Sequence, residues 1–483
     1  MCGIFGILLA DGRTLEQTNL PVLAVNGLTA LQHRGTESTG IVGSDGIDND
    51  HINIVKGHGL VRDVYDEVGI STLNDSRVLI GHNRYSTAGL KNSGINCVQP
   101  FVVYTAFGTI GIAHNGEVVN AKNKRKELLD QGVGLSTDTD SELIAQMIAK
   151  AVALNKKCRN SADPGDISKE LAVTMMEISM SFSLLVMTFD RIYAIRDPYG
   201  NRPLAVATVY DDSGALAYCA ASETCAFPSK SKLNFEVSPG EVVEITKTGI
   251  RSVFQMKPTT KQAMCIFEYV YFARSDSVLE GQQVQTAREE CGRALAEEDD
   301  VSADIVGNVP DSSMSAAIGY ATQAGIPYEP CFHRNSYVGR SFIQPSNQKR
   351  VNAINQKFGV LQKKIEGKRI VLVDDSIVRG NTMRVLVKML KEAGAAEVHL
   401  RIASPPVKYP CFMGINIPTQ TELIAANKTN EEMKVFFGAD SVKYLSVEGL
   451  EKAVQTNIKK KNLYSTGHCM ACLNQDYPVP MEI

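Results

Sequence analysis

The sequence lacks a large excess of charge of either sign. Its 50 lysine and arginine residues, against 53 aspartate and glutamate residues, give a formal net charge of -3 at pH 7. Basic residues gather only in short runs such as 459–461. Domains that bind nucleic acid usually carry a basic face. The composition therefore gives no indication of a nucleic-acid partner, and we interpret the short basic run as a solvated surface.

Long apolar runs are also missing. No stretch approaches the ~20 apolar residues that a membrane-spanning helix needs, and the first residues lack the basic segment, apolar segment and cleavage site of a secretory signal. We find no fixed-period repeat and no low-complexity segment. We therefore expect a cytoplasmic globular protein without membrane contact, and the 483 residues predict two or three domains.

Cysteine is the exception in this ordinary composition. Eleven cysteines occur, but the number is odd and most are scattered, which argues against the disulfide framework of a secreted protein. Six of them fall in no motif and are interpreted as small core or surface residues: Cys97, Cys158, Cys219, Cys225, Cys291 and Cys331. The other five are candidates for a chemical role.

The stretch 369–382 has the strongest local pattern. Its aliphatic run 370–373 is too short for a helix and is flanked by charge, which predicts a buried strand. The strand ends in Asp374 and Asp375, and a turn with Gly380 leads into a helical pattern. Strand, acidic pair, glycine turn and helix start together predict an anion-binding loop.

The side chains and backbone groups of this loop limit the kind of ligand that it can bind. Ligands of open α/β sheets bind beyond the carboxyl ends of the strands, where loop N–H groups and a helix N-terminus favour phosphate. Ser376 and Thr382 add hydroxyl donors. The two carboxylates would repel phosphate, so they accept hydrogen bonds from sugar hydroxyls or hold a divalent cation. A ribose phosphate meets both needs; the alternative is an ordinary strand-turn-helix with a solvated acidic turn.

The whole stretch resembles the phosphoribosylpyrophosphate (PRPP) loop of type I phosphoribosyltransferases. The resemblance implies an α/β domain and a magnesium site at Asp374 and Asp375. It also implies that PRPP is bound by Asp374, Asp375, Ser376, Ile377, Val378, Arg379, Gly380, Asn381 and Thr382.

Cys2 precedes a short apolar run that predicts a strand. Removal of Met1, expected when a small residue follows, would leave Cys2 with both a thiol and a free α-amino group. That amine titrates near ~7.7–8.0, so it can accept the thiol proton at neutral pH. The alternative is a small buried apolar cysteine, and Cys2 alone favours that alternative.

Four ordered segments change this judgement: 31–40, 81–89, 113–117 and 137–142. They resemble the glutaminase domain of class II (N-terminal nucleophile) amidotransferases. The family has an α+β fold in which two sheets lie between two helix layers (αββα), and helical patterns around 18–33 and 139–154 fit it. We expect this domain to cover residues 2–255. A turn and closing strand at 239–245, followed by a largely polar stretch, predict this boundary.

The resemblance also implies roles for single residues. Cys2 is the nucleophile, and the Asn115 side chain and the Gly116 N–H form the oxyanion hole. Arg84 holds the α-carboxylate of glutamine and Asp140 its α-ammonium group. Taken singly, Arg84 fits a surface salt bridge, Asn115-Gly116 a hairpin turn and Asp140 a helix cap.

The segment 265–277 opens the second half and resembles the amidophosphoribosyltransferases, which join a class II glutaminase to a phosphoribosyltransferase. We expect residues 256–483 to form that second domain, with a C-terminal helical segment. In the family, the position of Ser312 lies near the magnesium ion. The segment 334–345 resembles the loop that closes over PRPP, which makes Arg340 a PRPP ligand.

This loop departs from the family pattern. The family usually has Lys-Asn-Arg-Tyr-Val-Gly-Arg-Thr, whereas Arg334 and Ser336 replace the lysine and the first arginine here. A missing cation would weaken closure or PRPP affinity. The departures keep an alternative open, a divergent paralogue that retains only glutaminase activity or PRPP or nucleotide binding as a regulator.

A CxxC pair near the end, Cys469 and Cys472, is compatible with structural zinc, a redox couple or an iron–sulfur site. Cys265, Cys411, Cys469 and Cys472 fall where the cluster-bearing branch of the family has its four ligands. The resemblance implies one [4Fe–4S] cluster and one magnesium ion per subunit. It further implies conversion of glutamine, water and PRPP to glutamate, 5-phosphoribosylamine and pyrophosphate, internal ammonia transfer, feedback inhibition by purine nucleotides, and a homotetramer.

Overall fold

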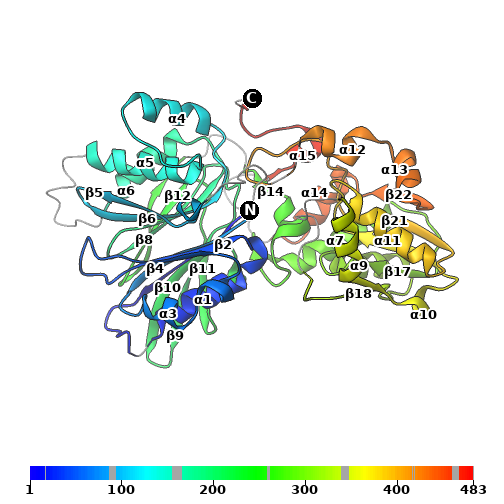
Figure 1. Ribbon diagram of the computed structural model, residues 1–483, viewed down its shortest axis with the longest axis horizontal. Helices are drawn as coiled ribbons and strands as arrows, with labels where there is room; N and C mark the ends of the chain where they lie inside the picture. The colour runs from blue at the N-terminus through cyan, green and yellow to red at the C-terminus, as the bar shows by residue number, and fades with distance from the viewer. Residues whose placement is uncertain are drawn as a thin grey trace.

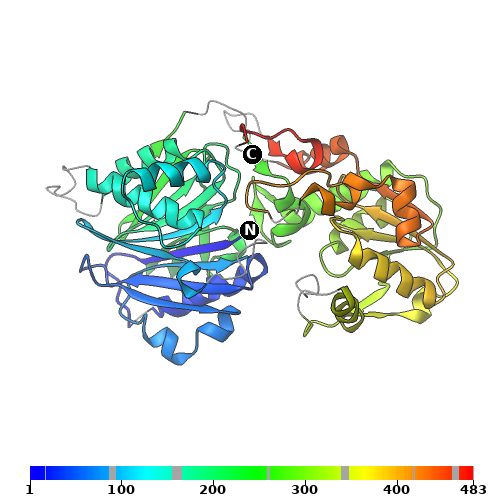
Figure 2. The ribbon, with the colours of Figure 1, turned by 45° about the horizontal axis from the view of Figure 1, so that its top comes forward.

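The computed structural model describes residues 1–16, 18–85, 94–154, 166–257, 262–338, 347–415, 417, 419–458 and 467–481. The chain forms two halves that lie side by side (Figure 1). The N-terminus lies at the junction between them in both views (Figure 2). Among the described residues, no helix is both long enough and apolar enough to cross a bilayer.

The first half contains a seven-stranded antiparallel sheet in the order β11-β9-β10-β1-β4-β2-β3. Strands β1, β2 and β4 are buried along their whole length, because one face of the sheet packs on helix α1 and the other on a second sheet. The strands are β1 (Gly3–Leu9), β2 (Ser38–Ser44), β3 (Asn53–His58), β4 (Val78–Arg84), β9 (Ala205–Asp211), β10 (Gly214–Ala221) and β11 (Ser231–Glu236).

The second sheet of this half has six antiparallel strands in the order β13-β12-β8-β7-β6-β5. Aliphatic side chains from both sheets, such as Ile80 and Leu185, form the core between them. The strands are β5 (Phe101–Thr105), β6 (Gly108–Gly116), β7 (Phe182–Met187), β8 (Ile192–Arg196), β12 (Glu241–Thr246) and β13 (Gly249–Gln255).

Helices cover the outer face of each sheet, so this half has the four-layer αββα arrangement that the sequence predicts. The first sheet is covered by α1 (Leu20–Ala30), with η1 (Gln32–Arg34), α2 (Val61–Val64) and α3 (Glu67–Ser71) nearby; the second is covered by α4 (Ala121–Asp130), α5 (Asp140–Leu154) and α6 (Ser168–Glu177). One expectation was wrong in detail: the polar stretch after residue 245 contains the strand β13. Its side chains are half-buried or exposed at the sheet edge, so they carry no strong apolar signal.

The second half is built on a four-stranded parallel sheet in the order β17-β20-β21-β22. The central strand β20 (Arg369–Asp374) buries Val371 and Val373 on one face and Ile370 and Leu372 on the other, as its unbroken aliphatic run predicts. The neighbouring strands are β17 (Ile305–Asn308), β21 (Glu397–Ile402) and β22 (Ser441–Tyr444).

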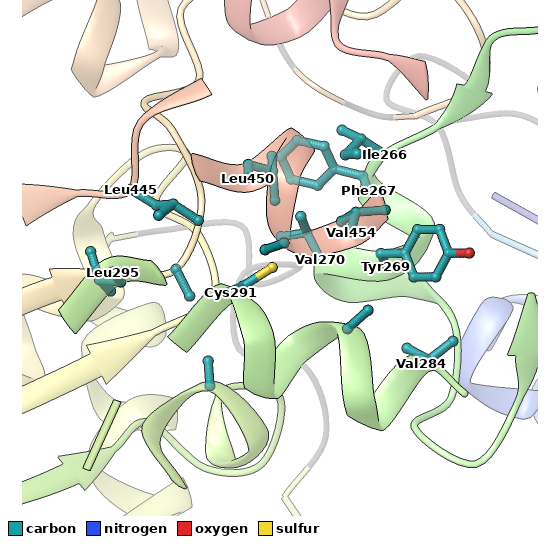
Figure 3. Close-up of a cluster of buried hydrophobic side chains, with 14 of the residues drawn as sticks. Ile266, Phe267, Tyr269, Val270, Val284, Cys291, Leu295, Leu445, Leu450 and Val454 are labelled. Carbon is teal, nitrogen blue, oxygen red and sulfur yellow. The ribbon is translucent and has the colours of Figure 1, made fainter. Parts of the chain in front are cut away.

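Helices lie on both faces of this sheet. Figure 3 shows the core on one face, where Cys291 and Leu295 of α7 meet Leu450 and Val454 of α14. The helices are α7 (Val284–Glu297), α8 (Met314–Ala324) and α14 (Val447–Gln455) on this face, and α9 (Asn347–Lys357), α11 (Asn381–Glu392) and α13 (Asn430–Phe437) on the other.

The end of the chain returns to the junction between the halves. Strand β23 (His468–Cys469) pairs in parallel with β14 (Met264–Cys265), where the second half begins. The short helix α15 (Ala471–Asn474) follows, and the π-helical turn η5 (Glu268–Phe272) follows β14. The remaining short elements are η2 (Ile95–Cys97), η4 (Thr224–Ala226), β15 (Val278–Leu279), β16 (Gln282–Gln283), β18 (Phe332–Arg334), β19 (Phe358–Val360), α10 (Gln362–Ile365), η7 (Gln420–Glu422) and α12 (Ile424–Asn427).

Candidate active sites

Cys2 and Asn115 meet at the junction end of the first half. Cys2 directly precedes β1, and Asn115 is the last but one residue of β6. The Cys2 backbone nitrogen donates a hydrogen bond to Asn115 Oδ1 at 3.0 Å. Asn115 Nδ2 is buried and has no partner among the described residues. A buried amide donor without a partner is costly, and here it lies beside a thiol.

Gly116 supplies a second donor, its backbone N–H. Its neighbour Glu117 exchanges two backbone hydrogen bonds with Ser181, at 3.0 and 2.9 Å. Because hydrogen-bonded and non-hydrogen-bonded pairs alternate in an antiparallel ladder, Gly116 lies opposite Phe182 in a non-hydrogen-bonded pair and its N–H points away from β7. On the other side of β6, pairing with β5 stops at Ile112. The Gly116 N–H therefore points to the side of β6 on which, within the described part of the chain, no strand pairs with this residue.

The structure brings Arg84 and Asp140 to this end as well. Asn83 pairs with Gly3, so Arg84 at the end of β4 lies next to Cys2 in the sheet. Its Nη1 donates to the Cys97 carbonyl oxygen at 3.2 Å. Asp140 begins α5 and accepts a hydrogen bond from the Val118 N–H at 2.9 Å.

Two buried histidines lie behind these residues. Burial lowers the pKa of His82 to about 3, with the charge of Arg84 adding to the effect. Burial also lowers the pKa of His114, whose Nδ1 lies 3.0 Å from Ser141 Oγ. Both imidazoles are therefore neutral near pH 7. Ser141 lies within the segment 137–142, but no role is predicted for it from the sequence, since a serine inside a helix carries no distinctive signal.

The α-amino group of this chain lies at the same junction. Met1 is buried, and its nitrogen donates to the Gly414 carbonyl oxygen at 3.1 Å. Burial lowers the pKa of this amino group to about 6. An amine in these surroundings is a free base at neutral pH, which is the state that accepts a thiol proton.

A buried ion network, which sequence reasoning missed, holds the nucleophile from behind. Arg34 Nε donates to the Cys2 carbonyl oxygen at 2.9 Å. Its other nitrogens bind the carboxylates of Glu223 and Glu268, and all three side chains are 0% exposed. Glu268 belongs to η5 in the second half, so Arg34 links Cys2 to both halves.

The second candidate site is at the carboxyl end of β20. Asp375 accepts hydrogen bonds from Ser376 Oγ at 2.7 Å and from Ser312 Oγ, so Ser312 lies beside the acidic pair as the sequence predicts. Burial and the neighbouring Asp375 raise the pKa of Asp374, and burial raises that of Asp375. Two carboxylates that resist ionisation in this way suit a cation between them.

The loop after the acidic pair ends at the first turn of α11. Gly380 has a φ of +76° and precedes the helix. A Cβ atom there would lie 2.8 Å from Ile424 Cδ1, so only glycine fits without strain. The N-terminus of α11 favours an anion in front of the acidic pair. Arg340 and the other residues from 339 to 346 in the predicted lid lie outside the described residues; Arg334 bonds to Asp311.

The four cysteines of the predicted cluster converge at the junction. Cys265 and Cys469 are register partners in the β14–β23 pair. Burial raises the pKa of Cys265 to about 11 and that of Cys469 to about 12, and nearby thiols including Cys411 add to both shifts. The pKa of Cys472 is raised by burial and by the thiols of Cys411, Cys265 and Cys469. Among the described residues, no three cysteine, histidine or acidic side chains lie close enough to hold one metal ion.

Comparison with known proteins finds a matching domain in each half of the chain. A glutamine amidotransferase domain model matches residues 82–228, and a phosphoribosyl transferase domain model matches residues 298–403. The amidophosphoribosyltransferase of Mus musculus is 47% identical over 513 aligned residues, which cover 100% of this chain and 98% of the mouse protein. The chain belongs to the amidophosphoribosyltransferase family.

Other amidophosphoribosyltransferases extend this likeness. The Bacillus subtilis enzyme is 40% identical, with 99% of this chain and 94% of that protein covered. A B. subtilis glutamine PRPP amidotransferase structure, complexed with ADP and GMP, matches with a TM-score of 0.84 and 38% identity over 99% of this chain and 97% of that one. The present chain is therefore a glutamine-dependent pentosyltransferase that catalyses the first step of purine biosynthesis. The matches span both of its halves, so both domains are present.

Proposed function

We propose that Cys2 attacks the glutamine amide with the residues around it in the roles that the family resemblance implies. The observation that carries this proposal concerns the Asn115 side chain. Its Oδ1 accepts a hydrogen bond from the Cys2 nitrogen, and its Nδ2 is buried without a partner among the described residues. Once Met1 is removed, that nitrogen is an amine, and Asn115 Oδ1 keeps it beside the thiol. The amine takes the thiol proton as the sulfur attacks.

The tetrahedral intermediate places its oxygen between two donors, Asn115 Nδ2 and the Gly116 N–H. Both are fixed before the reaction, so they stabilise the negative charge without reorganising. Arg84 binds the α-carboxylate of glutamine and Asp140 its α-ammonium group. Ammonia leaves, and water then releases glutamate from the thioester.

We propose that PRPP binds in the loop 374–382. The carboxylates of Asp374 and Asp375 hold the ribose hydroxyls, and loop N–H groups with Ser376 and Thr382 hold the phosphate. The donor set of two aspartates and Ser312 fits one magnesium ion, because magnesium prefers hard oxygen ligands and a cation would offset the burial that raises the pKa of both carboxylates. When bound, magnesium neutralises charge on the pyrophosphate. Ammonia displaces pyrophosphate at the anomeric carbon.

We also propose that Cys265, Cys411, Cys469 and Cys472 hold one [4Fe–4S] cluster. All four are free thiols in this structure, and burial together with neighbouring thiols raises the pKa of Cys265, Cys469 and Cys472. They would ionise only beside a positive centre. The cluster would join the C-terminal segment to β14 and take no part in the reaction.

The remaining proposals concern the whole molecule. The domain boundary lies after residue 255, since β13 ends there as the edge strand of its sheet, which gives domains 2–255 and 256–483. Ammonia passes inside the protein between them. Purine nucleotides inhibit the enzyme; the B. subtilis structure with ADP and GMP supports nucleotide binding. A homotetramer and a cytoplasmic location remain predictions from the sequence.

Anaerobic assays with glutamine, PRPP and magnesium test the two-site scheme, with glutamate and pyrophosphate measured together. We expect Cys2→Ala to abolish glutamine use and keep synthesis from ammonia, and Cys219→Ala, which removes a buried thiol from the same half, to keep both. Loss of both activities in Cys2→Ala would count against separate sites. For the cluster, we expect a brown protein with about four irons per chain; a colourless zinc protein would refute that assignment.

A further inference from the structure

Gly414, in the loop that follows Cys411, lies against the backbone of the proposed oxyanion hole. Its φ is +91°. A Cβ atom on Gly414 would lie 2.9 Å from the Gly116 carbonyl carbon, 3.1 Å from its oxygen and 3.2 Å from the Glu117 nitrogen. Two backbones, one from each half of the chain, therefore touch at the peptide bond that follows the oxyanion donor.

The Gly116 backbone is enclosed on its other side too. A Cβ atom on Gly116 would lie 2.0 Å from the Ser181 carbonyl oxygen. Ser181 is held by the ladder, since it exchanges backbone hydrogen bonds with Glu117. The Gly116–Glu117 peptide is thus confined between Ser181, just before β7, and the loop that contains Gly414.

A single buried arginine ties both walls together. Arg202 is fully buried, and its Nε donates to Ser181 Oγ at 3.2 Å. Its Nη2 donates to the carbonyl oxygen of Met413, the residue before Gly414. On the far side of the loop, the Met413 N–H donates to Cys411 Sγ at 3.4 Å. The position of Gly414 is therefore fixed from both halves of the molecule.

We propose that Gly414 is a positioning residue for glutamine hydrolysis, because its bare backbone supports the Gly116–Glu117 peptide and so sets the direction of the Gly116 N–H. The inference rests on the proposed oxyanion hole at Asn115 and Gly116. It makes the phosphoribosyltransferase half a structural part of the glutaminase site, and it gives the segment after Cys411 a role in catalysis beyond joining the two halves.

The expected size of the effect follows from the contacts. Catalytic groups must be held within about 0.5 Å of their productive place, and loss of a whole oxyanion donor lowers kcat by about 10²–10³. A methyl group at Gly414 displaces the peptide without removing the donor. We expect Gly414→Ala to lower kcat for glutamine hydrolysis about tenfold or more, with a nearly unchanged KM because Arg84 and Asp140 are untouched.

Gly438→Ala is the matched control. Gly438 also has a positive φ, +70°, but no atom lies within 4 Å of its Cβ position. Both substitutions carry the backbone strain of a left-handed residue, about 1 kcal/mol, and only one meets Gly116. The assays measure glutamate release for kcat and KM, pyrophosphate release with ammonia in place of glutamine, and iron content per chain in the holoenzyme.

A selective loss of glutamine turnover in Gly414→Ala, with ammonia-dependent synthesis and iron content equal to those of Gly438→Ala, supports the proposal. Equal glutamine turnover in the two variants, or a parallel fall of both activities, overturns it. If Gly414→Ala yields no folded protein, Arg202→Lys is tested instead. A selective loss of glutamine turnover in that variant supports the proposal, and an unchanged ratio of glutamine turnover to ammonia-dependent synthesis overturns it. Glutamine hydrolysis that survives Cys2→Ala would instead refute the proposed function itself.

Discussion

Replacement of Arg34 by methionine tests the energetics of the domain junction. The guanidinium of Arg34 is fully buried and is bound to Cys2, Glu223 and Glu268. Methionine keeps much of the side-chain volume but leaves two carboxylates in the interior without their shared cation. The desolvation of those carboxylates is then no longer compensated.

Glu223 and Glu268 differ in the partners that they keep when Arg34 is replaced. Glu223 keeps hydrogen bonds from His33 and Ser277, whereas Glu268 keeps, among the ion pairs of the described residues, only the more distant Arg202 at 3.9 Å. Breaking a buried pair from one side costs about 3–5 kcal/mol. For a unit of 150–250 residues, 1 kcal/mol shifts the melting temperature by about 2–4 °C, so the first half should melt roughly 6–20 °C earlier.

The pH dependence has a definite sign. Burial by itself would raise the pKa of Glu223, but the charges of Arg34 and His33 outweigh it and hold the pKa well below the usual value of 4.5. A carboxyl with a depressed folded pKa adds stability above its unfolded pKa and loses it as the pH falls through the folded pKa. The destabilisation by Arg34→Met is therefore full at pH 7 and shrinks in acid.

The assay is thermal unfolding by circular dichroism, because the chain contains no tryptophan to report by fluorescence. Arg62→Met is the control: Arg62 and Asp63 form a surface pair with side chains 81% and 52% exposed, which contributes about 0–1 kcal/mol. A melting temperature of Arg34→Met within error of that of Arg62→Met would refute the reasoning. So would an Arg34→Met shift that grows toward acid.

Three further predictions follow from the sites. Asn115→Ala should lower glutamine turnover by about 10²–10³ while ammonia-dependent synthesis continues, as measured by glutamate and pyrophosphate release; equal loss of both would contradict the assigned role. Gly380→Ala should lower stability by about 1–3 kcal/mol and raise the KM for PRPP, since its Cβ would lie 2.8 Å from Ile424 Cδ1; an unchanged KM would argue against this loop as the PRPP site. Burial and Asp375 raise the pKa of Asp374 above 3.8, so the ligand-free protein loses stability as pH rises from there through the folded pKa. Asp374→Asn should remove that loss, so the variant should have a higher melting temperature than wild type at pH 7 but not near pH 4, and it should no longer use PRPP. Equal melting temperatures of the two proteins at both pH values would contradict the predicted direction of the pH effect.

Local patterns predicted the elements that carry the second site. The aliphatic run, the acidic pair and the glycine correspond to β20, its carboxyl end and the start of α11, and the helix expected from about residue 382 begins at Asn381. The helices expected around 18–33 and 139–154 are α1 with η1, and α5. Each of these signals depends on residues within about four positions of one another, which is the range of helix and strand periodicity.

The edge strand β13 shows where local patterns fail. Its residues are exposed or half-buried, so they alternate too weakly to predict a strand. Pairing with β12 decides its conformation, because an edge strand is stabilised by ladder hydrogen bonds more than by its own side chains.

By itself, the sequence predicted the acidic loop after β20, because that pattern depends on residue types at short, regular spacings. Its resemblance to known families predicted the order of the two domains and Cys2 as the nucleophile. Only the tertiary structure decided which distant residues complete them. Arg34 meets Glu268 across 234 positions, and Arg202 meets the carbonyl oxygen of Met413 across 211. Gly414 touches Gly116 from the other half of the chain. Such contacts depend on how helices and sheets pack, and packing is set by the whole folded chain rather than by any one segment.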